Sequence, residues 1–149
     1  MERIAVFVND AAHARHLLHP MLATAAAAHW IVVTCPPTLT RHVGRWVSKQ
    51  ARRAWRERWG DELFAQIEPV LRAHPGSQIE RLLASRPLTE VSSRLQARLP
   101  GVRLLDARRP ALGRQEEPLT AAQPLPPADR WTGTVAAAGG LTAVLALVD

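Results

Sequence analysis

The 149-residue chain has a single cysteine, no tyrosine and no long apolar run near its start. One cysteine, Cys35, cannot form an internal disulfide, so the sequence does not indicate folding in an oxidising compartment. The first apolar run, Ile4–Val8, is too short for the core of a signal peptide. The composition, with 47% hydrophobic residues and 12 prolines, excludes a disordered chain, a collagen and a disulfide-stabilised scaffold. We therefore expect a folded domain, with the bulk of the chain in the cytoplasm.

Motifs that would assign a chemistry are also missing. The sequence has no P-loop, no GxGxxG, no GxSxG, no HExxH and no zinc-ligand spacing. It contains no recognition-helix, RNP, KH or zinc-finger pattern, so nucleic acid is disfavoured as a partner. The sequence therefore assigns neither a reaction nor a cofactor.

What the sequence does contain is an alternation of short β-branched apolar runs and helical patterns over its first hundred or so residues. This alternation is typical of an α/β fold, with a parallel sheet and helices on its faces. The expected strands are Ile4–Val8, His29–Thr34, Gln78–Ala84 and Val102–Asp106. The expected helices are Ala11–Ala28, a long helix from Thr38 or Thr40 toward His74, and Pro87–Leu99. We predict a small three-layer domain over residues 1–109, with a parallel sheet of about four strands.

The rest of the chain has a different character. Residues 110–130 carry five prolines and few large apolar side chains, which predicts a semi-extended linker. Residues 131–148 form an uncharged run that is just long enough to cross a bilayer as a helix. We expect a C-terminal apolar helix that anchors the chain in a membrane. The alternative is that Gly139-Gly140 breaks this run and that Leu141–Val148 is a fifth, buried strand.

The net charge of +6 is confined to one segment. Residues 41–60 hold seven basic residues and one acidic residue, and the remaining residues balance at 12 against 12. The expected long helix places several of these bases on one face, namely Arg45, Lys49, Arg52, Arg53 and Arg56. We expect Trp46, Trp55 and Trp59 to pack inward beside them. The face suits an anionic membrane surface or an acidic protein, and the alternative is a solvated face whose arginines pair with carboxylates.

The candidate ligand site lies at the ends of the expected strands. In open parallel sheets, ligands bind beyond the carboxyl ends of the strands, where the strand order reverses. The residues at those ends are Asn9, Asp10, Cys35 and Asp106. We predict that these four residues contribute to ligand binding.

The first strand and its polar end, Ile4 to Asp10, resemble the opening of universal-stress-type nucleotide-binding domains. The resemblance implies that Asp10 faces a nucleotide. It covers this stretch and the alternating pattern, and it departs after the fourth strand, where the family has a glycine-rich phosphate loop. Here no glycine follows Asp106 until Gly113.

A metal site is a second hypothesis for the same edge of the sheet. Asp10, His13 and His16 are spaced by three residues, and Cys35 would be the fourth ligand if the first two strands are neighbours. The alternative is that the histidines decorate a helix surface and that Cys35 is a small buried apolar residue.

Together these features predict a cytoplasmic α/β binding domain that is tethered to a membrane and presents a ligand- or partner-binding surface there. The alternative is a soluble nucleotide-binding protein or small enzyme with its site around Asp10 and Cys35. A second copy of the chain is a further candidate partner.

Overall fold

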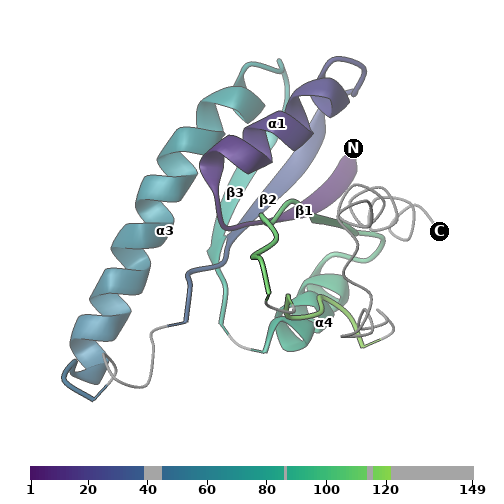
Figure 1. Cartoon of the computed structure of the whole chain (residues 1–149). Coiled ribbons are helices and arrows are strands. Elements are labelled where there is room, and N and C mark those ends of the chain that lie inside the picture. The colour runs from purple at the N-terminus through teal and green to yellow at the C-terminus, as the bar shows by residue number, and fades with distance from the viewer. Residues whose placement is uncertain (39–44, 86, 114–115, 122–149) are drawn as a thin grey trace.

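The computed structural model describes residues 1–38, 45–85, 87–113 and 116–121, and shows an α/β fold (Figure 1). Its elements are β1 (Glu2–Val8), α1 (Ala11–Leu22), β2 (Ala28–Thr34), α3 (Lys49–Arg72), β3 (Gln78–Leu83), α4 (Leu88–Arg98) and β4 (Arg103–Asp106). The predicted four-stranded parallel sheet with flanking helices is confirmed. The predicted apolar helix over residues 131–148 lies outside the described residues.

The strand order is β3-β2-β1-β4, and all neighbouring strands are parallel. The chain first moves in one direction across the sheet, from β1 to β2 to β3, and then returns past β2 and β1 to form β4. Because parallel crossovers are right-handed, α1 and α3 pack on one face and α4 packs on the other. Figure 1 shows α1 and α3 side by side, with α4 on the opposite face of the strands. The domain therefore has three layers, as predicted.

Each face of the sheet has its own apolar core, because alternate residues of a strand point to opposite faces. The core under α1 and α3 includes Ile4, Val6, Val8, Ala14, Leu18, Trp30, Val32, Leu63, Ile67 and Leu71. The core under α4 includes Ala5, Phe7, Ile31, Val33, Cys35, Val91, Leu95, Leu104 and Leu119. The central strands β1 and β2 are therefore buried on both faces, which explains their continuous apolar sequences.

The packed domain extends past the predicted boundary at residue 109. Leu119, in the segment predicted as a linker, is 2% exposed and belongs to the core under α4. The Glu117 carboxylate also accepts a hydrogen bond from the Leu88 backbone N–H at the start of α4, at 2.8 Å. Residues 116–121 are thus part of this layer.

The long helix α3 begins later than the sequence pattern predicted. It starts at Lys49, after Ser48, whose hydroxyl accepts a hydrogen bond from the Ala51 N–H at 3.1 Å. A serine that caps the first turn in this way favours a helix start at that point over the earlier threonines. As a consequence Arg45 and Trp46 precede the helix and do not lie on its face.

Only the second half of α3 is packed on the sheet. Its buried residues are Gly60, Leu63, Ile67 and Leu71. The 24-residue helix is about 36 Å long, and its amino-terminal half extends beyond the strands (Figure 1). Apolar residues recur every four positions from Val43 to Leu71, which predicts a packed stripe along the whole helix, but the fully buried residues begin at Gly60.

Among the described residues, no helix is both long enough and apolar enough to cross a membrane. The segment predicted to do so, residues 131–148, lies outside that part of the chain.

Candidate functional site

The strand order places a topological switch point between β1 and β4. The chain leaves β1 toward β2 on one side, while β4 lies on the other side, so the connections diverge above the carboxyl ends of these two strands. A divergence of this kind leaves a crevice in which ligands of open α/β sheets bind. Asn9 and Asp10 follow β1, and Arg108 and Arg109 follow β4 closely.

A hollow of about 340 Å³ lies at this switch point. It is lined by Asn9, Asp10, Arg109, Pro110, Ala111 and Leu112. Asn9 and Asp10 were predicted as ligand-binding residues, and the structure brings them together on one wall of this switch-point hollow. The hollow is shallow and open to solvent, so a compact molecule bound there would be only partly covered.

Asn9 holds the loop after β4 in place. Its Oδ1 accepts a hydrogen bond from the Arg109 backbone N–H at 2.6 Å, and its Nδ2 donates to the Arg109 carbonyl at 3.3 Å. The side chain amide thus pairs with the main chain of Arg109 as a neighbouring strand would. The two hydrogen bonds fix the backbone of Arg109 and leave its side chain available to contact Asp10.

The Asp10 carboxylate makes two contacts, one with each of its oxygens. Its Oδ1 accepts a hydrogen bond from the His13 backbone N–H at 2.8 Å and so caps α1. Its Oδ2 lies 3.6 Å from Nη1 of Arg109. The His13 N–H holds the pKa of Asp10 below its ordinary value; burial opposes this effect, and the charge of Arg109 adds to it. Asp10 is therefore an ionised acceptor that faces the hollow at neutral pH.

Asp106 lies at the same edge, but its carboxylate is engaged by Arg108. The Arg108 side chain is 4% exposed and donates from Nε and Nη2 to the two oxygens of Asp106, at 2.9 and 3.0 Å. Nη2 also donates to the Glu117 carbonyl at 2.7 Å. Burial lowers the pKa of Arg108, but the hydrogen bonds and charge of Asp106 outweigh it and the net pKa is raised. Asp106 thus holds residues 116–121 on the sheet through Arg108.

Cys35 follows β2 at the same edge, where its backbone N–H donates to the Val8 carbonyl at 2.8 Å, but it does not line the switch-point hollow. It is 7% exposed, it packs in the core under α4, and its Sγ donates to the Val33 carbonyl at 3.6 Å. Helix α1, which carries His13 and His16, covers the other face of the sheet. The structure therefore does not bring the four residues of the metal hypothesis together. No cluster of three or more His, Cys, Asp or Glu side chains suited to a metal occurs within residues 1–38, 45–85, 87–113 and 116–121.

Arg108 and Arg109 are the site residues that the sequence did not indicate. Both lie at the predicted end of the domain, where a proline follows and strong helix or strand signals stop. The spacing Asp106-x-Arg108 directly after a buried strand was the available signal, since a buried carboxylate needs a cationic partner.

We expect Asp10→Ala to lower the free energy of unfolding by about 1 kcal/mol at neutral pH, because an N-cap is lost. The pKa of Asp10 is lower in the folded state than in the unfolded chain, so its stabilisation is present above the unfolded pKa and is lost as the pH falls through the folded pKa. The difference between variant and wild type should therefore shrink in acid. Urea unfolding at a series of pH values measures it.

Glu62→Ala is the matched control, because it removes an exposed carboxylate from α3 and leaves every helix cap in place. A difference between Asp10→Ala and wild type that stays constant from neutral pH into acid would contradict the capping role of the ionised carboxylate.

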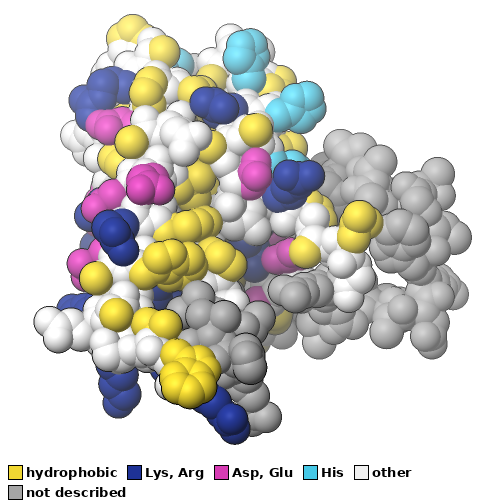
Figure 2. Space-filling view, turned by 60° about the vertical axis from the view of Figure 1, so that its left-hand side comes forward, with side chains coloured by type: hydrophobic (Ala, Val, Ile, Leu, Met, Phe, Trp, Pro, Cys, Tyr) yellow, Lys and Arg dark blue, Asp and Glu magenta, His cyan; other side chains and the backbone are white. Residues whose placement is uncertain are grey.

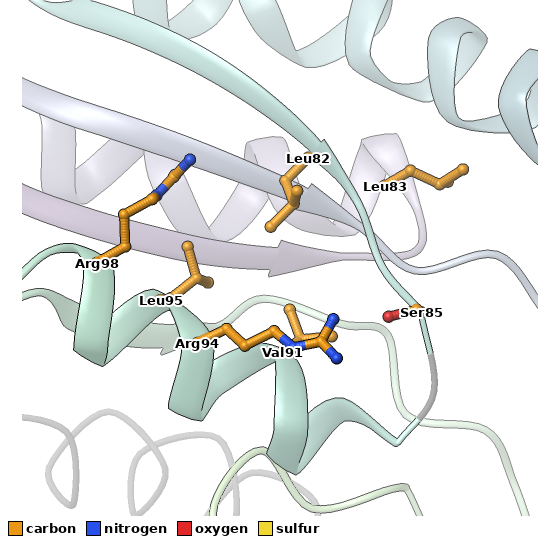
Figure 3. A pocket seen from close by; sticks show the side chains of 7 residues that line it. All are labelled: Leu82, Leu83, Ser85, Val91, Arg94, Leu95 and Arg98. Atoms are coloured by element: carbon orange, nitrogen blue, oxygen red, sulfur yellow. The ribbon is translucent and has the colours of Figure 1, made fainter.

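A second, smaller hollow of about 160 Å³ lies between β3 and α4. Leu82, Val91 and Leu95 face one another across it, with Arg94 and Arg98 alongside (Figure 3). Arg98 pairs with Glu80 and Arg94 pairs with Glu90. Its lining is therefore mainly apolar with neutralised charges at the rim, so we place the candidate ligand site at the switch-point hollow.

The residues predicted to form an anionic-partner face are only partly on one surface. Lys49, Arg52 and Arg53 are exposed in the first turns of α3, and Arg45 is exposed just before it. Arg56 is half-buried, and its Nη2 donates to the Ala84 carbonyl at 2.6 Å. Arg56 therefore fastens α3 to the end of β3, and we group the other four cations as the exposed set.

The prediction that the tryptophans pack inward is wrong for Trp46. Its side chain is 84% exposed, because it precedes the helix start at Ser48 and does not reach the sheet. Trp59 packs against the core under α1 and α3, and Trp55 is half-buried. In the space-filling view, Lys and Arg side chains border exposed hydrophobic atoms at the lower end of the molecule, where α3 begins in Figure 1 (Figure 2).

Comparisons of the chain with protein-family models, with curated proteins and with solved structures gave no match.

Proposed function

We propose that this chain is a small α/β binding domain whose ligand occupies the switch-point hollow. The observation that carries the proposal is the pair formed by Asp10 and Arg109, which face each other at 3.6 Å in that hollow. One strand end thus supplies an anionic acceptor and the neighbouring strand end supplies a cationic donor, at the position where this fold class binds ligands.

The chemistry of the pair defines the ligand class. The Arg109 guanidinium is 69% exposed and suits a phosphate or a carboxylate, to which arginine donates two parallel hydrogen bonds. The ionised Asp10 carboxylate only accepts hydrogen bonds, so it suits a hydroxyl group. A small molecule with an anionic group and a neighbouring hydroxyl, such as a nucleoside monophosphate, matches both partners.

The pair can open to admit such a ligand at little cost. The 3.6 Å separation is longer than the 2.7–2.9 Å of a tight charge-assisted hydrogen bond. Exposed ion pairs contribute at most about 1 kcal/mol, so separating Asp10 from Arg109 is easily offset by two new hydrogen bonds to a ligand. The Asn9 amide holds the Arg109 backbone meanwhile, so the loop keeps its position.

The test is a titration with adenosine 5′-monophosphate, followed by the backbone amide signals in nitrogen-15 NMR spectra. We expect saturable shifts at Asn9, Asp10 and Arg109. Arg109→Gln should raise the dissociation constant about tenfold or more, because a hydrogen bond to a charged group contributes about 1.5–3 kcal/mol. The hydrogen bonds between Asn9 and the backbone of residue 109 do not need the Arg109 side chain, so the variant should keep the fold.

Arg103→Gln is the matched control, because Arg103 pairs with Glu2 at the amino ends of the strands, the opposite edge of the same sheet. It should bind like the wild type. Inorganic phosphate and succinate complete the panel, since each offers the anionic group without the hydroxyl. If none of the three compounds shifts the signals around the hollow, the proposal is wrong.

We retain the membrane tether as a second proposed function. The uncharged run of eighteen residues over 131–148, preceded by Arg130, supports it. In that arrangement the tether holds the α/β domain in the cytoplasm at the inner face of a membrane, and the ligand hollow belongs to the tethered domain.

A further inference from the structure

A second surface of the domain is distinct from the ligand hollow. It is formed by Arg45, Trp46, Lys49, Arg52 and Arg53, and we name it the Trp46 surface. It lies at the end of α3 that extends beyond the strands (Figure 1). The first buried residue of α3 is Gly60, so this surface stands clear of both apolar cores.

The Trp46 surface combines strong positive charge with an exposed aromatic ring. Four of its five members are cations, and Glu57, the one acidic residue between 41 and 60, pairs with Arg53. Trp46 is 84% exposed and is one of three exposed large hydrophobic residues in the part of the chain that the structure describes. An indole ring in water is unfavourable, and its apolar body with one polar N–H suits a boundary between water and an apolar phase.

The neighbouring contacts hold this surface in shape. The Arg56 guanidinium donates to the Ala84 carbonyl at 2.6 Å and ties the middle of the projecting half-helix to the end of β3. Arg52 donates to the Val47 carbonyl at 3.4 Å, which fixes the turn that carries Trp46 against the first turn of the helix. All five residues of the surface are exposed around the start of α3.

We propose that the Trp46 surface docks on an anionic lipid bilayer, with the Trp46 ring among the headgroups and the four cations against them. Tryptophan is enriched at the interface between membrane and water, and basic residues beside it are attracted to anionic lipids. The shape argues for a bilayer over single-stranded nucleic acid, which binds in grooves that stack successive bases on several aromatic rings. Here a projecting helix end presents one ring, that of Trp46, which is 84% exposed, while Trp55 is half-buried and Trp59 packs against the core under α1 and α3.

This inference is independent of the ligand hollow and of the predicted tether. A tether over residues 131–148 would insert into neutral and anionic bilayers alike, because it is uncharged. The Trp46 surface adds binding that requires anionic lipid and weakens with salt. The difference between anionic and neutral vesicles therefore measures this surface alone.

The experiment uses the full chain with vesicles of phosphatidylcholine alone and of phosphatidylcholine mixed with phosphatidylserine, followed by co-sedimentation. We expect stronger partitioning onto the mixed vesicles. This gain should disappear as salt rises from about 0.1 M to about 1 M, where the Debye length falls from about 10 Å to about 3 Å. The variant Arg45→Gln/Lys49→Gln/Arg53→Gln should lower the partitioning onto mixed vesicles about 100-fold, since each cation contributes about a fivefold factor.

Trp46→Ala should lower partitioning onto mixed vesicles about tenfold, because the buried ring is lost. The matched control is Trp46→Phe, which keeps an apolar aromatic ring at this exposed position. For the charge variant the control is Arg72→Gln/Arg94→Gln/Arg98→Gln, which removes three exposed arginines from other parts of the helices. Both controls should partition like the wild type.

Equal partitioning onto neutral and mixed vesicles would overturn the proposal. It would also fall if the charge variant bound mixed vesicles as well as its control did. Tighter binding of a single-stranded oligonucleotide or of polyglutamate than of mixed vesicles, at the same salt, would assign the surface to another partner and likewise overturn it. Circular dichroism of each variant checks that the fold is retained, as expected for exposed positions.

Discussion

Arg108→Met should lower the free energy of unfolding by about 3–5 kcal/mol, one of the largest losses expected for any single replacement in this chain. The Arg108 side chain is 4% exposed, and the Asp106 carboxylate that it binds is 16% exposed. Methionine fills much of the same space but offers no donor. The Asp106 carboxylate would then lose both hydrogen bonds from the guanidinium and keep the one from the backbone N–H of residue 108, and the Glu117 carbonyl would lose its hydrogen bond from Nη2. Urea unfolding of variant and wild type measures the loss.

A double variant separates the ion pair from simple packing. Asp106→Asn/Arg108→Met removes the buried charge together with its partner, so it should be more stable than Arg108→Met alone, because an uncompensated carboxylate is the main cost. Arg94→Met is the control, since its pair with Glu90 is exposed and contributes less than about 1 kcal/mol. A loss for Arg108→Met no greater than for Arg94→Met would refute the assigned role.

The order of helices and strands was predictable from the sequence because each element satisfies one simple rule. Ile4–Val8 and His29–Thr34 are continuous apolar runs, and the structure buries both strands on two faces. The chain direction across the sheet was not predictable, since no local pattern states whether β4 joins β3 or β1. That choice creates the switch point. The sequence therefore predicts the fold class but not the location of the site.

The candidate site was predicted in part. Asn9 and Asp10 follow a recognisable strand and line the hollow, as the position of strand ends suggests. Cys35 also follows a strand, yet its side chain faces the core under α4. Successive side chains of a strand point to opposite faces, and the sequence does not show which face the residue after Thr34 takes. Arg109 was missed because its role depends on a non-local pairing with Asn9, a hundred residues earlier in the chain.

The long helix is packed over a shorter stretch than its periodic apolar pattern predicts. Apolar residues recur every four positions from Val43 to Leu71, which predicted one continuous packed stripe. The sheet is shorter than the helix, so the members of the stripe that are fully buried begin at Leu63, and Trp59 before them is only partly buried against the core. Period alone indicates which residues share a face, and the length of the opposing layer decides how many of them are buried.

At Gly60, helix α3 lies close to the ends of β2 and β3. A methyl group at this position would lie 2.9 Å from Oγ1 of Thr34 and 3.1 Å from Cδ1 of Leu83. Thr34 is fully buried, and its hydroxyl donates to the Leu82 carbonyl at 3.4 Å. The absence of a side chain at Gly60 is therefore what allows the helix to rest on the ends of β2 and β3.

Gly60→Leu should lower the free energy of unfolding by about 3 kcal/mol, because four extra carbons must enter space that Thr34 and Leu83 occupy. Gly60→Ala should change it by less than about 1 kcal/mol, since the gain of about 1 kcal/mol in helix propensity offsets most of the strain at Thr34. Ala54→Leu, at an exposed position of the same helix, is the control and should be nearly neutral. Thermal and urea unfolding of the three variants measure these differences. A Gly60→Leu protein as stable as Ala54→Leu would show that α3 can lift from the sheet without loss, and so that the contact at Thr34 does not position the projecting half of the helix.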